Sequence, residues 1–477
     1  MATISPYPLR AFLILCVCVS ACTSSKTSGP PAAKQPMNVI LFYADDLGWM
    51  DLGIQGSPYY ETPHLDQLAA EGVRFTQAYA NAANCAPSRA CLMTGMYTPR
   101  HGIYTVSNSD RGKSINRQLI PTKNTTVLDS ALLTMPQYFQ QNGYQTCMAG
   151  KWHLSNDPLP YGFHTNFGGN HRGAPKSYFS PYKNPALSDG PEGEHLPDRL
   201  STEVSQWIES KKDSPFFVYF PFYSVHTPIQ AREDLTTKYQ AKQAGIYHNK
   251  PEYAAMIEAM DAAVGKILAQ LKELGLEDQT IILFTADNGA QDQQTLSRPL
   301  RGAKGMYYEG GIRVPFLIKW PGLTQAGTTN ETPIIGSDLF PTFVDMLGGE
   351  PAAHPVDGQS ILPLLSGKKM SERALYWHFP AYLQMYKKSR AFEDSHDKPF
   401  FRTAPVSVIR EGDWKLLEFF EEGDLELYNL ADDLGEQNNL INTHPEKAKE
   451  LHQNLLDWRA ETHAPVPTER NPEYQEQ

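Results

Sequence analysis

The sequence predicts an α/β protein in which a large, mostly parallel (mixed) sheet is flanked by helices, followed by a smaller C-terminal α+β part with an antiparallel sheet. Two continuous apolar runs, at 38–44 and 280–286, each end in polar residues and a turn glycine. Such runs are typical of strands buried on both faces of a helix-covered parallel sheet. Three short strand-like segments at 406–410, 414–420 and 425–430 predict the antiparallel sheet.

Length and charge limit the domain count and the partners. The chain has 477 residues, which allows roughly two to four domains of about 150 residues each. Its formal net charge is −11 and its pI is about 5.7, so we expect no nucleic-acid partner held by bulk charge. An anionic substrate would have to be bound by a local cluster of cationic side chains.

Residues 1–22 have the pattern of an export signal. A basic residue precedes the apolar run 11–19, which is too short to span a bilayer as a helix and ends in small residues. The string Val-Ser-Ala-Cys that ends at Cys22 resembles the lipobox of bacterial lipoproteins, which implies lipidation of Cys22. Residues 23–36 read as a flexible tether. We expect an exported protein, anchored to the membrane by lipid and facing the periplasm or the cell surface, with secretion without lipid as the alternative.

Three cysteines remain beyond the signal and Cys22. They are Cys85, Cys91 and Cys147, an odd number that makes no disulfide framework. Cys91 and Cys147 are interpreted as small buried apolar residues.

The stretch 84–90 predicts an anion pocket at the start of a helix. Pro87 suits a first helical turn, so Cys85 would lie just before the helix N-terminus, where free N–H groups favour an anion. Arg89, one turn later, falls on the same face. A buried cysteine beside a surface arginine is the alternative.

Four predicted strands end in reactive residue types. Two of the strands lead into carboxylates and an amide, and two lead into a lysine and histidines, which suggests one shared cleft at the carboxyl edge of the sheet. The residues that follow these strands are Asp45, Asp46, Lys151, His153, His226, Asp287 and Asn288. The oxygen ligands suit Ca²⁺ or Mg²⁺ and are poor for zinc. Taken singly, each Asp pair could instead be a turn or a helix cap.

The other segments supply scaffold and loops. A helix is predicted at 251–274, ended by Gly275, and a strand at 316–320. The stretch 163–182 reads as a long loop in which His171 and Arg172 are candidates for substrate contact. A break near 364–369 divides a catalytic part, 37–365, from a C-terminal part, 366–477.

Together these motifs resemble the type I, formylglycine-dependent sulfatases of the alkaline-phosphatase superfamily, over nearly the whole mature chain. An alkaline-phosphatase-like fold is thereby implied. The motifs that carry the resemblance are Ala44-Asp45-Asp46, Cys85-Ala86-Pro87-Ser88-Arg89, Gly150-Lys151-Trp152-His153, His226-Thr227-Pro228, Asp287-Asn288-Gly289, and Lys304 with Glu309-Gly310-Gly311-Ile312-Arg313-Val314-Pro315.

The resemblance implies that Cys85 is oxidised to formylglycine by a formylglycine-generating enzyme and acts as the hydrated aldehyde. One hydroxyl of the hydrate would attack sulfur to give a covalent sulfo-enzyme intermediate, and deprotonation of the other would expel sulfate. The residues implied to hold one Ca²⁺ with residue 85 are Asp45, Asp46, Asp287 and Asn288.

The resemblance also implies roles for the cationic residues. Arg89 and Lys151 would stabilise the hydrate, and His153 would be the base that triggers sulfate release. His226 with Lys304 would contact the sulfate and assist the leaving oxygen as general acid. These residues would form the cationic cluster that an acidic protein needs for an anionic substrate.

The C-terminal strings at 375–380 and 425–430 are similar to those of bacterial sulfatases that act on polysaccharides. This implies hydrolysis of sulfate esters on an oligo- or polysaccharide, from a marine or host glycan. Trp377 and His378 are candidates for a sugar-binding rim, with aromatic packing at the domain junction as the alternative. Two other functions stay open: a phosphodiester or phosphonate ester hydrolase of the same superfamily, and an unmodified, inactive calcium-binding surface lipoprotein.

Overall fold

Five parallel strands and three further strands form one mixed sheet, which confirms the predicted fold class. In this computed structural model the described residues are 1–6, 36–353, 355–397 and 399–476. The predicted cleavage and lipidation site at Cys22, and nearly all of the tether, lie outside them. The strand order is β5-β4-β6-β1-β7-β8-β2-β9. The bounds are β1 Asn38–Ala44, β2 Val73–Phe75, β4 Gln145–Ala149, β5 Thr165–Phe167, β6 Phe216–Pro221, β7 Thr280–Ala286, β8 Phe316–Lys319 and β9 Thr328–Asn330.

The direction of each strand follows from its neighbours. Strands β5, β4, β6, β1 and β7 pair in parallel, whereas β8 runs antiparallel to both β7 and β2. The strand expected at 316–320 is therefore present, but it reverses the sheet. The predicted loop at 163–182 contains β5. This strand could not be predicted, because it has only three residues and they are of mixed polarity.

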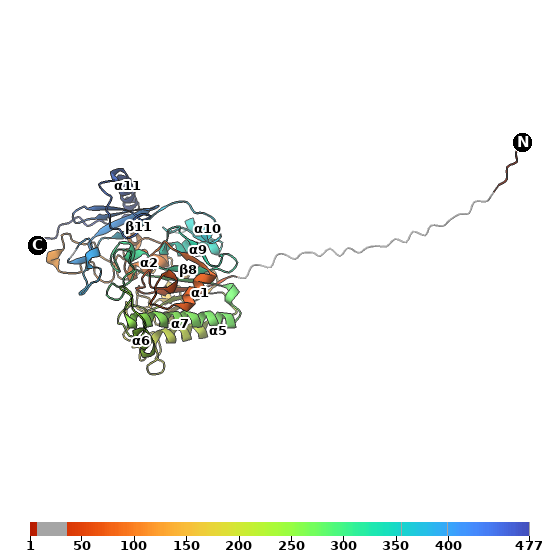
Figure 1. The fold of residues 1–477 in the computed structure, drawn as a ribbon, viewed down its shortest axis with the longest axis horizontal. Helices are drawn as coiled ribbons and strands as arrows, with labels where there is room; N and C mark the ends of the chain where they lie inside the picture. Colours follow the sequence, from red (N-terminus) through yellow and green to blue (C-terminus); the bar gives the residue numbers. More distant parts are fainter. Residues whose placement is uncertain (7–35, 354, 398, 477) are drawn as a thin grey trace. The chain divides into compact units, whose positions relative to one another are not determined.

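Two hydrophobic cores cover the two faces of the sheet. Ile40 and Phe42 of β1 pack into one core, and Val39 and Leu41 pack into the other, as the period-two alternation of a strand requires. Helices α5, α6 and α7 gather beneath one face, and α9 and α10 lie on the other side of the sheet (Figure 1). The bounds are α1 Pro63–Glu71, α2 Cys85–Thr94, α4 Met135–Gln141, α5 Leu196–Lys211, α6 Glu233–Gln240, α7 Pro251–Glu273, α9 Leu339–Met346 and α10 Leu362–Leu365.

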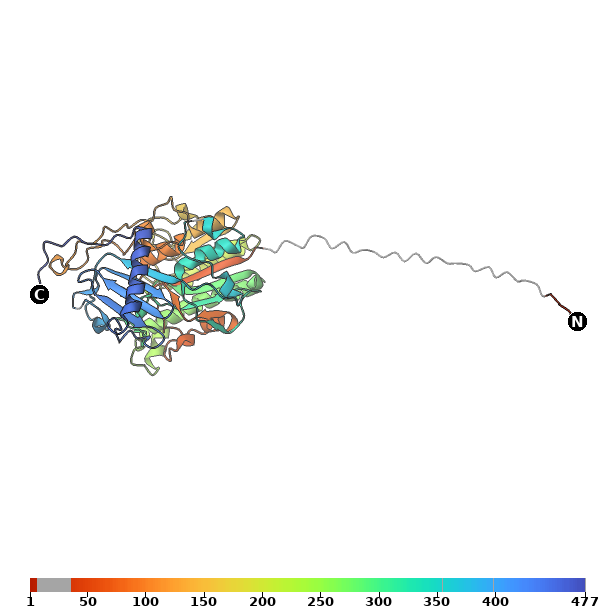
Figure 2. The same cartoon turned by 90° about the horizontal axis from the view of Figure 1, so that it is seen from above.

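An antiparallel sheet follows the catalytic part, as predicted, and a fourth strand joins the three predicted ones. Its order is β11-β14-β15-β16, and α11 (Pro445–Thr462) crosses one face of it (Figure 2). One hydrophobic core contains residues of both parts, for example Tyr307 and Trp377. The two parts therefore pack as layers of one unit, from Met37 onward. The bounds are β11 Ala374–Phe379, β14 Val406–Glu411, β15 Trp414–Phe419 and β16 Leu425–Asn429.

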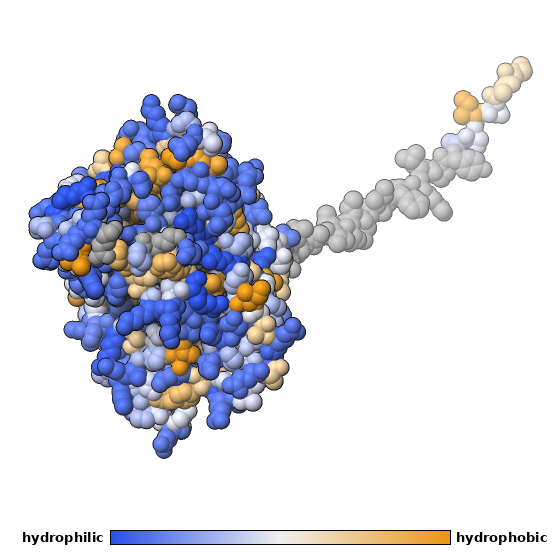
Figure 3. Space-filling model, turned by 60° about the vertical axis from the view of Figure 1, so that its left-hand side comes forward, coloured by the Kyte–Doolittle hydropathy of each residue, from blue (hydrophilic) through white to orange (hydrophobic). Residues whose placement is uncertain are grey.

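Short elements complete the fold near the site. They are β3 Ala78–Tyr79, β10 Ile334–Ile335, β12 Leu383–Gln384, β13 Phe401–Thr403, α3 Thr98–His101 and α8 Glu309–Ile312. The face drawn in Figure 3 is mostly hydrophilic, with apolar residues in scattered groups. Within the described residues, no helix combines the length and the apolar character needed to cross a membrane.

Candidate active site

The four reactive strand ends predicted from the sequence lie next to one another. Strands β4, β6, β1 and β7 are consecutive in the sheet and all parallel, so their carboxyl ends share one edge. The residues that follow these strands are Lys151 and His153, His226, Asp45 and Asp46, and Asp287 and Asn288. The sheet topology therefore gathers seven candidate residues from segments far apart in the sequence.

A buried network joins Arg89 and Lys151 to two of the aspartates. Lys151 Nζ lies 2.7 Å from Asp45 Oδ2, and Arg89 Nε and Nη2 lie 3.0 and 2.7 Å from Asp287 Oδ2. Arg89 Nη1 also donates to the Lys151 carbonyl, at 2.8 Å. All four side chains are at most 1% exposed. The alternative of a surface arginine at position 89 is therefore wrong.

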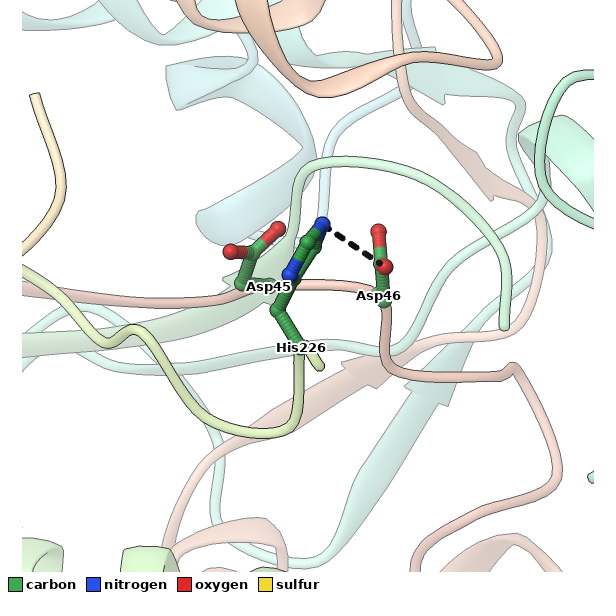
Figure 4. A group of neighbouring side chains, drawn as sticks. All are labelled: Asp45, Asp46 and His226. Atoms are coloured by element: carbon green, nitrogen blue, oxygen red, sulfur yellow. Dashed lines mark ion pairs between the residues drawn. The ribbon is translucent and has the colours of Figure 1, made fainter. Parts of the chain in front are cut away.

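Asp46 is the centre of a second group of contacts. Lys304 Nζ lies 2.6 Å from its Oδ1 and 2.7 Å from its Oδ2, and Asn288 Nδ2 donates to Oδ1 at 2.8 Å. His226 Nε2 is 3.6 Å from Asp46 Oδ2, and its ring lies between Asp45 and Asp46 (Figure 4). Asp46 has a φ of 61°, a left-handed conformation that aspartate tolerates better than most residues. This turn directs adjacent carboxylates into one pocket.

Cys85 lies at the start of α2 and faces the same carboxylates. It is the first helical residue and 3% exposed, and its N-cap, Asn84, has extended backbone and no side-chain cap bond. Ligand atoms of Asp45, Cys85 and Asp287 lie within 4.8 Å of one another. The positive end of the helix and two acidic groups therefore meet at the Cys85 side chain.

The acidic residues fit a divalent cation. Ligand atoms of Asp45, Asp46 and His226 also lie within 4.8 Å of one another. Asp45 Oδ1 and Asn288 Oδ1 are buried and have no hydrogen-bond partner among the described residues. Unsatisfied buried oxygens are costly, and a hard cation such as Ca²⁺ or Mg²⁺ would satisfy them.

The electrostatics of the carboxylates support the same conclusion. Burial raises the pKa of Asp45 well above its usual range; Lys151 lowers it, and the like charges of Asp287 and Asp46 raise it further. Burial would also raise the pKa of Asp46, but Lys304 and His226 hold it well below its usual range. The protein cations thus offset the burial of Asp46, whereas those beside Asp45 do not offset its burial.

Both histidines of the pocket favour their neutral forms. Burial, and then the positive charges of Lys151 and Arg89, lower the pKa of His153 well below its usual range. Burial and Lys304 lower the pKa of His226 to about 3. His226 Nδ1 donates to the Thr227 carbonyl at 2.7 Å, which leaves Nε2 as the nitrogen that faces Asp46.

A loop after β5 covers His153. The His153 N–H donates to the Asn170 carbonyl at 2.9 Å, and a Cβ at Gly173 would lie 2.5 Å from the His153 ring. Between these two positions, His171 is exposed and Arg172 half-buried, with Arg172 Nη1 bonded to the Lys183 carbonyl at 2.9 Å. These two candidates therefore belong to the loop that contacts His153.

His378 lies inside the C-terminal part and not on an open rim. It is 1% exposed, its Nδ1 is 2.7 Å from Ser407 Oγ, and its Nε2 is 2.9 Å from the Pro465 carbonyl. Trp377 is equally buried and donates to the Ala80 carbonyl at 2.8 Å. Neither side chain has an open polar atom for a sugar, so the packing alternative describes them.

Residues outside the predicted motifs also reach the pocket. Arg402 Nη1 donates to the Lys304 carbonyl at 3.0 Å, and Arg111 is joined to Arg402 through Gln384, which accepts from both arginines. Both arginines come from loops or short strands with no distinctive pattern. Sequence reasoning missed them because an isolated arginine in a loop is most often a solvated surface charge.

Comparison with known proteins agrees with this geometry. A family model described as Sulfatase matches residues 37–349, and one described as N-sulphoglucosamine sulphohydrolase, C-terminal, matches residues 303–461. The chain is 32% identical to a sulfatase of Formosa agariphila, over 91% of this chain and 90% of that protein. It is 32% identical to N-acetylgalactosamine-6-sulfatase of Homo sapiens, over 73% of this chain and 70% of that protein.

A solved structure has the same fold along most of the chain. The crystal structure of Ps i-CgsB in complex with k-i-k-neocarrahexaose superposes with a TM-score of 0.71 and 27% identity, covering 89% of this chain and 93% of that chain. Sequence, fold and the arrangement of charged groups at one sheet edge thus lead to the same conclusion. The chain belongs to the sulfatase family and is a sulfuric ester hydrolase.

Proposed function

We propose that this enzyme removes sulfate esters from a sulfated oligo- or polysaccharide, using formylglycine at position 85 and one Ca²⁺. The observation that carries the proposal is the buried cluster in which Cys85 meets two aspartates at the start of α2. A carbohydrate substrate is supported by two relatives: one is named for a sulfated sugar, and the other was crystallised with a carrageenan-type oligosaccharide.

The position of Cys85 fits a residue that is modified to serve as nucleophile. As formylglycine hydrate, it would supply one hydroxyl to attack sulfur and a second whose deprotonation releases sulfate. Arg89 and Lys151 lie around the same carboxylates and would hold the hydrate in place. Maturation requires a formylglycine-generating enzyme as a partner.

The residues that would hold the cation are Asp45, Asp46, Asp287, Asn288 and residue 85. The cation would act as a Lewis acid on the sulfate oxygens. Asp45 Oδ1 and Asn288 Oδ1 are the two protein atoms that most need it. Ca²⁺ is favoured over zinc because the donor set is made of hard oxygens.

The histidines and Lys304 would move and stabilise protons. His153 has the low pKa of a group that is neutral at pH 7, as a base for the second hydroxyl must be. His226 presents Nε2 beside Asp46 and Lys304, where a bound sulfate ester would favour its protonation and allow it to assist the leaving oxygen. Lys304 would contact the sulfate.

We further propose that the protein is exported and anchored by a lipid on Cys22, facing the periplasm or the cell surface. The support is the apolar run 11–19 and the lipobox-like string that ends at Cys22. Labelling of the native protein with a radioactive fatty acid should be lost in Cys22→Ala. Retention of label in that variant would contradict the anchor.

Comparison of sulfate and phosphate release from matched aryl esters tests the reaction class. We expect faster release from 4-nitrophenyl sulfate; much faster release from the phosphate would favour a phosphodiesterase-like or phosphonate hydrolase function. Mass spectrometry of the peptide that contains residue 85 should find an aldehyde. A thiol there, with no turnover, would favour an inactive calcium-binding lipoprotein.

A further inference from the structure

Two arginines meet on one residue beside the pocket. Arg111 Nε donates to Gln384 Oε1 at 3.0 Å, and Arg402 Nε donates to the Gln384 carbonyl at 3.1 Å. Gln384 belongs to the two-stranded sheet of β12 and β13, and Arg402 is in β13. Two guanidinium groups are therefore fixed to the same short strand pair, although Arg111 is 273 residues away from Gln384 in the sequence.

This arginine pair adjoins the reaction centre. Arg402 Nη1 donates to the carbonyl of Lys304, whose Nζ lies on Asp46. The N–H of Gly305, the residue after Lys304, donates to the Ala83 carbonyl at 2.8 Å, two residues before Cys85. The arginines are therefore close enough to the site for one substrate molecule to reach both. An anionic group bound by the arginines would then belong to the same molecule as the sulfate at residue 85.

Neither arginine has an acidic partner. Among the described residues, no carboxylate forms an ion pair with Arg111 or Arg402, whereas the buried Arg89 and the half-buried Arg373 each pair with an aspartate. Arg402 is 4% exposed, and Arg111 is half-buried. Burial, and then the like charge of Arg402, lower the pKa of Arg111. Two partly desolvated like charges held together repel each other, and an anion between them would remove the repulsion.

The remaining donors are available and oriented. Arg402 Cζ lies 3.6 Å from the centre of the Tyr386 ring, so the ring fixes the plane of the guanidinium. Within the described part of the chain, Nη1 and Nη2 of Arg111 and Nη2 of Arg402 have no protein acceptor. Planar donors of this kind match the oxygens of a carboxylate or a sulfate.

We propose that Arg111 and Arg402 form a second anion subsite, which binds a sulfate ester or a carboxylate on the sugar that carries the scissile sulfate or on its neighbour. The natural substrate would then be a multiply anionic glycan. This inference rests on the proposed function and makes its substrate class more specific. It also explains how a chain with a net charge of −11 binds a highly anionic polymer: the polymer contacts a local group of cationic residues, Arg111, Arg402 and Lys304.

Competition against turnover of 4-nitrophenyl sulfate by the full, matured enzyme tests the subsite. The competitors are disaccharides with one sulfate, positional isomers with two sulfates, and isomers with one sulfate and one uronic carboxylate. We expect the best doubly anionic isomer to compete at least tenfold better than the monosulfated one. Arg111→Gln should reduce this ratio to below threefold, and Arg111→Lys, which keeps the charge, should retain part of it.

The controls separate the subsite from the reaction itself. Arg74→Gln, on strand β2, should leave the competition ratio unchanged, and thermal unfolding should show that each variant is folded. Preference for the disulfated isomers assigns a sulfate to the subsite, and preference for the uronates assigns a carboxylate. Failure of the wild type to hydrolyse any sulfate ester would refute the proposed function. A ratio near one in an active wild type, or a ratio unchanged in folded Arg111→Gln, would refute the subsite.

Discussion

Two of the buried clusters of charge among the described residues differ in whether each oxygen has a close protein partner. At the junction with the C-terminal sheet, Lys415 Nζ lies 3.0 Å from Glu309 Oε1 and 2.8 Å from Glu436 Oε1. The other Glu309 oxygen accepts from Tyr79 at 2.7 Å, and the other Glu436 oxygen accepts from the Glu309 N–H at 2.7 Å. Each carboxylate oxygen there lies within 3.0 Å of a protein donor or cation, although Glu436 Oε1 has only the ion pair with Lys415 and no hydrogen bond.

The active-site cluster is as deeply buried but is incomplete. Asp45 Oδ1 and Asn288 Oδ1 have no hydrogen-bond partner among the described residues. Burial of charge alone therefore does not identify a functional site, because the junction cluster is equally buried. The active-site cluster is distinguished by its oxygens with neither a hydrogen-bond partner nor a close ion pair. Variants there should change metal content and activity, whereas variants in the junction cluster should change stability.

The largest effect is expected for Cys85→Ala. Without the precursor of the nucleophile, turnover of 4-nitrophenyl sulfate should fall by more than about 10⁴-fold, while thermal stability changes little. Steady-state kinetics and calorimetry measure the two quantities. Cys91→Ala, on the same helix and equally buried, is the control and should keep its activity. Retained turnover in a protein with alanine at position 85 would refute the mechanism.

Lys415→Met should damage stability and not metal binding. It leaves the Glu309 carboxylate buried without the lysine that it shares with Glu436, which should cost about 3–5 kcal/mol in the free energy of unfolding. Urea denaturation measures this loss. Lys319→Met, at a partly exposed lysine that also pairs with two glutamates, should cost at most about 1 kcal/mol. Equal costs would mean that burial of the junction cluster is energetically unimportant.

Asp45→Asn should reduce metal binding and activity more than stability. Loss of this charge should lower the calcium content per chain, measured by mass spectrometry of the metal, and should lower kcat/KM by about 100-fold. Asp51→Asn is the control: Asp51 is just as buried, but its Oδ2 accepts from the Gly48 N–H and from Tyr253. Full calcium content in folded Asp45→Asn would argue against a cation at the unmatched oxygens.

The sequence predicts those residues of the active site that follow a recognisable local pattern. Apolar runs that end in Asp-Asp or Asp-Asn-Gly indicate strand ends, and parallel pairing then brings Asp45 and Asp287 together. Arg111 and Gln384 could not be predicted to meet, because no local pattern links positions 273 residues apart. The junction cluster was missed for the same reason. Its members come from α8, β15 and a turn, each without an independent signal of burial.

The smallest expected effect is a pH dependence at the junction. Burial raises the pKa of Glu436 to about 7, whereas Lys415, Arg313 and Arg410 overcome burial and hold the pKa of Glu309 at about 2. Between about pH 4.5 and 7, Glu436 keeps its proton in the folded state and loses it in the unfolded state. The folded state binds more protons in this window, so the free energy of unfolding falls as pH rises.

Glu436→Gln should remove this contribution. The difference in unfolding free energy between variant and wild type should shift in favour of the variant by about 1–3 kcal/mol from pH 4.5 to pH 7.5, as measured by urea denaturation at both values. The exposed Glu473→Gln should give the same difference at both pH values. A shift in favour of the wild type would mean that Glu436 is ionised in the folded protein. The junction would then hold two carboxylates on one lysine, and it would resemble the active site more closely than its hydrogen bonds indicate.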